Sequence, residues 1–100
     1  MSENIEIDLD RDRIKTILAE AYEHCKTVLN EEFFETQEQF VAKINPYLDS
    51  NRVSVTVLLD LPSKNYPELK IEVNLRRKSI IARMANRKKR IYLNRYLTIL

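Results

Sequence analysis

The chain has 100 residues, of which 44% are hydrophobic and 32% are charged. This length and composition predict one small folded domain, residues 1–100, and exclude a disordered chain. The sequence contains no glycine and one cysteine, Cys25, so it lacks the glycine-rich loops that cradle nucleotide phosphates and cannot form an internal disulfide. An acidic N-terminus and the absence of a run of about 20 apolar residues favour a cytoplasmic protein that does not associate with membranes.

The first part of the chain predicts a strand and a long helix. Residues 5–9 alternate apolar and acidic side chains, as half-buried strands do. Asp10 suits the N-cap of a helix that ends near Asn30. Apolar residues recur in this helix at the i, i+3, i+4, i+7 spacing of one buried face. They are Ile14, Ile17, Leu18, Ala21, Tyr22, Cys25, Val28 and Leu29.

A second, shorter helix and a hairpin follow. Thr36 and Gln39 have the spacing of a capping box, and Pro46 limits the length of the helix that they begin. Residues 53–61 and 69–75 are rich in alternating apolar residues and flank a loop bounded by prolines, which predicts an antiparallel hairpin.

The last quarter of the chain fits two periods. Residues 76–90 contain apolar residues at helical spacing, and residues from Ile91 onward also alternate with period two. We expect a helix of about three turns followed by a strand. The element order is then β-α-(α)-β-β-α-β in an α+β domain, the order of a ferredoxin-like fold with an inserted helix. The alternative is two N-terminal helices on a β-hairpin with one long C-terminal helix.

Catalytic and metal-binding groups are sparse. His24 and Cys25 are neighbours on the predicted helix and point in different directions, so Cys25 is expected to be a small buried apolar residue. One Cys and one His do not make a zinc site, and the glutamates at positions 31, 32, 35 and 38 lack EF-hand spacing. The sequence therefore predicts neither an enzyme nor a cofactor.

Charge is distributed unevenly along the chain. Residues 1–50 hold 12 acidic and 5 basic side chains, whereas residues 51–100 hold 3 acidic and 12 basic ones. The stretch from Arg76 to Tyr96 has nine Lys or Arg and no acidic residue. A surface of this kind attracts polyanions. If residues 76–90 are helical, Arg76, Arg83, Arg87 and Arg90 share one side, where arginines suit phosphates and base edges.

We therefore expect a small, non-catalytic accessory or regulatory protein that binds DNA or RNA. The tyrosines close to Arg90 and Arg95 could stack on bases. The predicted contact residues are Arg76, Arg77, Lys78, Arg83, Arg87, Lys88, Lys89, Arg90, Tyr92, Arg95 and Tyr96. The alternative is a protein-interaction module that binds an acidic protein or forms a homodimer through its two oppositely charged halves.

Overall fold

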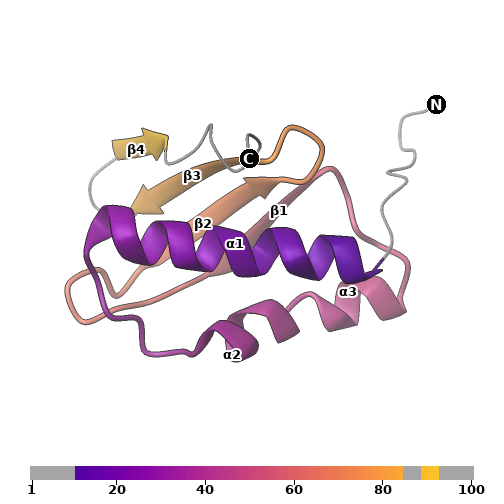
Figure 1. Ribbon diagram of the computed structural model, residues 1–100, viewed down its shortest axis with the longest axis horizontal. Helices are drawn as coiled ribbons and strands as arrows, with labels where there is room; N and C mark the ends of the chain where they lie inside the picture. The colour runs from indigo at the N-terminus through magenta and orange to yellow at the C-terminus, as the bar shows by residue number, and fades with distance from the viewer. Residues whose placement is uncertain (1–10, 85–88, 93–100) are drawn as a thin grey trace.

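The computed structural model describes residues 11–84 and 89–92, which form helices followed by strands (Figure 1). The helices are α1 (Arg11–Leu29), α2 (Gln37–Ala42) and α3 (Asn45–Asp49). The strands are β1 (Thr56–Asp60), β2 (Leu69–Asn74), β3 (Ser79–Met84) and β4 (Lys89–Tyr92). The α+β class is confirmed. The predicted strand at residues 5–9 and the Asp10 cap lie outside the described residues.

The long helix α1 matches its sequence pattern. Six of the eight predicted apolar positions are buried, and Val28 near the C-terminal end is 47% exposed. The residue after the helix is Asn30, whose φ of 55° lies in the left-handed region, and the N–H of Glu31 donates to the carbonyl of Lys26. Asparagine tolerates this backbone conformation better than most residues, so it replaces the usual glycine in a chain that has none.

The second helical region differs from the prediction in one respect. The capping box of Thr36 and Gln39 is present, with both reciprocal hydrogen bonds. Pro46, however, lies in the first turn of α3, where its missing N–H is not needed, instead of only ending the preceding helix. The helix α3 was not predicted from the sequence.

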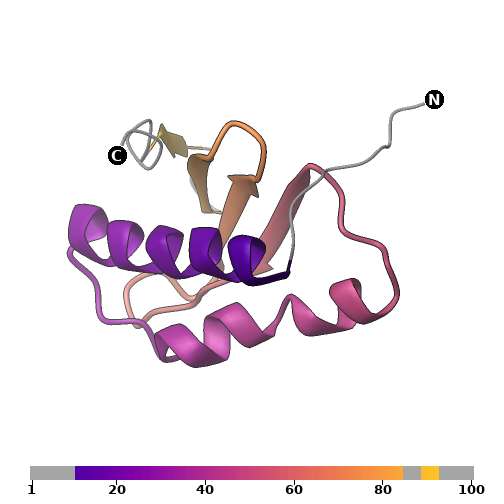
Figure 2. The ribbon, with the colours of Figure 1, turned by 45° about the vertical axis from the view of Figure 1, so that its right-hand side comes forward.

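The four strands pair antiparallel in the order β1-β2-β3-β4, each with its neighbour in the chain. Alternate residues of β1, β2 and β3 are buried, and Figures 1 and 2 show the helices gathered on one side of the sheet. Leu18, Phe40, Ile71 and Ile80 belong to the single buried cluster between the two layers. Because no described helix covers the other face of the sheet, we call it the open sheet face.

The helix predicted over residues 76–90 is wrong. Residues 79–84 form β3, whose Ile80 and Ala82 are buried and which pairs along its whole length with β2. Without β3, one edge of β2 would have unpaired backbone N–H and C=O groups. Residues 79–84 pair with these groups and bury Ile80 and Ala82, and this stabilises a strand more than their weak helical spacing stabilises a helix. The predicted element order β-α-(α)-β-β-α-β is therefore wrong at this point, because β3 stands where that order places its last helix. The alternative with a long C-terminal helix fails for the same reason.

Candidate nucleic-acid interface

The turn between β2 and β3 is fixed from within, although it contains no glycine. The side-chain Oδ1 of Asn74 accepts hydrogen bonds from the backbone N–H groups of Arg76 (3.0 Å) and Arg77 (2.7 Å). The N–H of Lys78 donates to the carbonyl of Asn74 at 2.6 Å, and the φ of Lys78 is 58°. Leu75 is 1% exposed and its N–H donates to the carbonyl of Val55 at 2.7 Å. The turn is therefore held by the hydrogen bonds of the Asn74 side chain and by the burial of Leu75.

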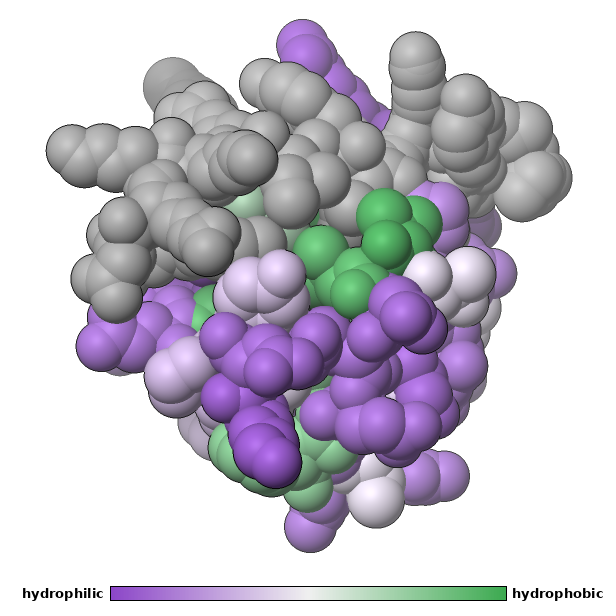
Figure 3. All heavy atoms as spheres, turned by 90° about the vertical axis from the view of Figure 1, so that its left-hand side faces the viewer, coloured by the Kyte–Doolittle hydropathy of each residue, from purple (hydrophilic) through white to green (hydrophobic). Residues whose placement is uncertain are grey.

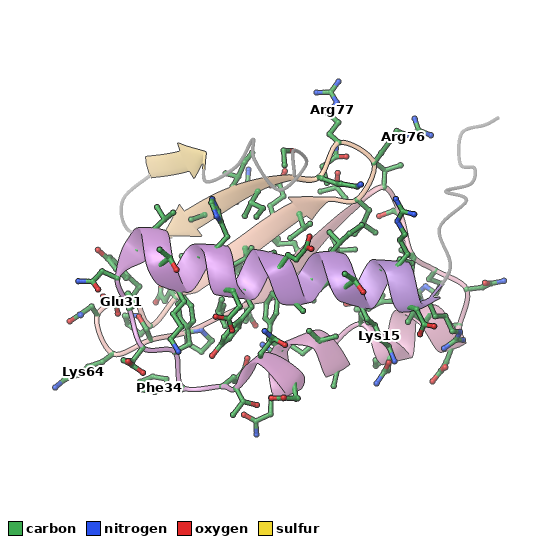
Figure 4. All side chains as sticks on the ribbon, viewed as in Figure 1. Lys15, Glu31, Phe34, Lys64, Arg76 and Arg77 are labelled. Carbon is green, nitrogen blue, oxygen red and sulfur yellow. The ribbon has the colours of Figure 1, made fainter. Side chains whose placement is uncertain are left out.

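This turn presents three adjacent cations, which we call the basic tip: Arg76, Arg77 and Lys78. Arg76 and Arg77 are exposed, and Figure 4 shows their side chains extending away from the ribbon. No ion pair joins a cation of the basic tip to an acidic residue within the described ranges. In this respect the basic tip differs from the basic side chains that ion pairs hold in the described sheet, such as Arg83.

The cations of the open sheet face, unlike those of the basic tip, have acidic neighbours. Arg83 lies opposite Lys70 in the register of β2 and β3. Arg83 Nε lies 3.2 Å from Glu72 Oε1, and Lys70 Nζ lies 2.6 Å from Asp60 Oδ1. The hydrogen bond from Lys70 lowers the pKa of the Asp60 carboxyl, against the smaller opposing effect of its partial burial. Both cations are thus already paired within the fold.

The structure therefore divides the predicted site. Arg76, Arg77 and Lys78 are brought together, but Arg83 is in a strand, so the predicted helical arginine row is wrong. In the register of β3 and β4, Arg90 lies opposite Arg83, and Tyr92 lies opposite Ile81. Lys89 is also in β4. The remaining predicted contacts lie outside the described residues, and their part in binding stays a prediction: Arg87, Lys88, Arg95 and Tyr96.

The acidic residues gather near the loop between α1 and α2. Burial raises the pKa of Tyr22 above its ordinary value, and the charges of nearby glutamates raise it further. These are Glu23, Glu32, Glu35 and Glu38. Within residues 11–84 and 89–92, no group of three or more His, Cys, Asp or Glu is arranged to hold a metal ion. The acidic region is best described as a charged surface.

Cys25 is part of the core. Its side chain is 0% exposed, and burial raises the pKa of its thiol to about 12. Burial of this kind keeps the thiol protonated at neutral pH. The expectation of a small buried apolar residue is confirmed.

Sequence reasoning missed two residues that shape the surface. Asn74 is the last residue of β2, within the predicted strand 69–75, but its side chain also holds the following turn, and asparagine is a common residue at such turns. Phe34 is not among the predicted site residues, and its side chain is 67% exposed. The paired phenylalanines in the sequence EEFFE could have indicated it, because adjacent loop residues seldom both face the core.

Comparison with family models, curated proteins and solved structures finds no match for this chain. The helices in the described part of the chain include none that is long and apolar enough to cross a membrane.

Proposed function

We propose that this protein binds duplex DNA without catalysing a reaction on it, with the basic tip as a main contact. One observation carries the proposal: Arg76, Arg77 and Lys78 lie side by side on an exposed hairpin turn and have no acidic partner among the described residues. Arginine offers paired donors that fit phosphate oxygens and the major-groove edge of guanine. A locked turn also loses little conformational entropy when it binds.

The narrowness of the tip favours DNA over RNA. Although β2 and β3 are the inner strands of the sheet, the turn that joins them spans two strands, about 4.8 Å apart, and the major groove of B-form DNA is about 12 Å wide. The major groove of A-form RNA is deep and too narrow for such an element. As part of the proposal we place the protein in the cytoplasm, since a buried, protonated Cys25 suits a reducing compartment.

The test is a fluorescence anisotropy titration with duplex DNA, duplex RNA and single-stranded DNA at several salt concentrations. Arg77→Glu is compared with Lys64→Glu, which makes the same change in charge on the exposed β1–β2 loop (Figure 4). We expect Arg77→Glu to reduce affinity for duplex DNA at least about tenfold and to lower the slope of log affinity against log salt by about one. Lys64→Glu should have a much smaller effect.

Three results would contradict the proposal. The absence of binding to duplex DNA at about 50 mM salt would refute it, because electrostatic binding is strong under that condition. Equal losses in Arg77→Glu and Lys64→Glu would show that net charge acts, and not the tip. Tighter binding to RNA or to a single strand would overturn the choice of duplex DNA.

A further inference from the structure

The loop between α1 and α2 presents an aromatic side chain on a fixed backbone. Phe34 is 67% exposed, whereas the preceding Phe33 packs edge-on against Tyr22 with ring centroids 5.4 Å apart. The N–H of Phe34 donates to the carbonyl of Pro62 at 3.1 Å, and Phe33 forms an antiparallel bridge with Ser63. An aromatic residue held in this way is a favourable anchor for a protein partner, because little conformational freedom remains to be lost.

Acidic side chains surround this anchor. Glu31, Glu32 and Glu35 lie within the same short loop, and we call residues 31–35 the Phe34 loop. Lys43 Nζ lies 2.7 Å from Glu35 Oε1, and Asn65 donates to Glu31, but Glu32 has no ion pair with a described residue. Figure 3, which looks at this end of the molecule, shows apolar atoms surfacing among hydrophilic ones. An exposed ring bordered by carboxylates is complementary to arginine, which combines cation–π and charge-assisted contacts.

The basic tip of the same protein carries exposed arginines of this kind. Arg76 and Arg77 lie at the upper right of Figure 4, and Phe34 and Glu31 lie at the lower left, so one copy cannot join its own two surfaces. We infer that the basic tip of one copy docks on the Phe34 loop of the next copy. Each copy then offers a cationic surface to one neighbour and an acidic aromatic surface to the other.

This geometry has two consequences. Because the two surfaces differ and lie apart, the contact is heterologous, and its repetition from copy to copy builds a ring or an open row. A hairpin tip against one loop buries a small area, so association is weak, reversible and reduced by salt. If the proposed DNA binding holds, DNA and the Phe34 loop compete for the same arginines.

Sedimentation velocity at about 50 mM salt tests the inference, because surface charges are weakly screened under that condition. Phe34→Ala removes one surface and Arg77→Glu removes the other. We expect each variant alone to associate at least about 30-fold more weakly than the unmodified chain, the size expected for loss of an aromatic hot spot. A 1:1 mixture should form a heterodimer and nothing larger, because each partner retains one intact surface. Tyr47→Ala, which removes another exposed aromatic residue from α3, should leave association unchanged.

The same variants separate this inference from DNA binding. Phe34→Ala should bind duplex DNA at least as well as the unmodified chain does, because it removes only a competitor for the arginines. If the unmodified chain stays monomeric, or the mixture of variants does, the inference is wrong even where DNA binding persists. If association follows the expected pattern but no DNA binds, the proposed function fails and the inference stands. A dimer that survives Arg77→Glu would also overturn it.

Discussion

The basic tip and the open sheet face come from neighbouring parts of one basic stretch, yet they offer different chemistry. Arg76 and Arg77 have no ion pair with a described residue, whereas Arg83 is paired with Glu72. The difference follows from topology. Strand pairing places side chains from adjacent strands next to one another, so the sheet supplies an acidic neighbour, while a turn has no strand beside it. Charge counted along a sequence therefore overestimates the charge that a partner can reach.

The two regions also differ in how they are held. Leu75 is buried in the turn at 1% exposure, whereas Leu58 on the open sheet face is 46% exposed. Leu75→Ala should lower the free energy of unfolding by about 2–5 kcal/mol, because it leaves a cavity under the basic tip. Leu58→Ala should cost less than about 1 kcal/mol. Urea denaturation of both variants measures this contrast. Equal losses would mean that the sheet face is covered in solution.

The hydrogen bonds from the basic tip to the Asn74 side chain provide the next test. Asn74→Ala removes an acceptor for the N–H groups of Arg76 and Arg77, so the free energy of unfolding should fall by about 1–2 kcal/mol. Asn74→Asp keeps the acceptor and adds a negative charge beside the arginines. It should therefore preserve stability and weaken DNA binding. If Asn74→Ala has the stability of the unmodified chain, the side chain does not hold the turn.

The sequence predicts best what local patterns decide. The stripe of α1 and the capping box at Thr36 depend on residues within a few positions of each other, and both were predicted correctly. The region after Arg76 could not be decided in this way. Ile80 and Ala82 have the spacing of a strand, whereas Ile80 and Met84 have the spacing of a helix. The pairing with β2 decides between the two, and the local sequence does not show that pairing.

The candidate site shows the same limit. The three cations of the basic tip were in the predicted site because they are adjacent in sequence. Arg83 was assigned to the same surface, and its pairing with Glu72 depends on strand register, which the helical interpretation could not supply. Phe34 was missed because a single exposed aromatic residue leaves no periodic pattern.

The smallest effect is expected for a variant that breaks an ion pair on the open sheet face. It tests whether such pairing keeps an arginine from binding DNA. Glu72→Gln releases Arg83, whose side chain is 43% exposed. Stability should change by less than about 1 kcal/mol, because partly exposed ion pairs contribute little. Affinity for duplex DNA should rise modestly, and its salt dependence should steepen by at most about one unit of slope as Arg83 gains a phosphate contact.

The matched control is Glu68→Gln, which removes one negative charge from an exposed position in the β1–β2 loop. It changes net charge equally but releases no described arginine. Parallel anisotropy titrations of the two variants separate the effects. If both raise affinity to the same extent, net charge alone explains the change and the pairing of Arg83 has no influence. A larger rise in Glu72→Gln would show that intramolecular pairing, set by strand register, decides which cations of this chain reach DNA.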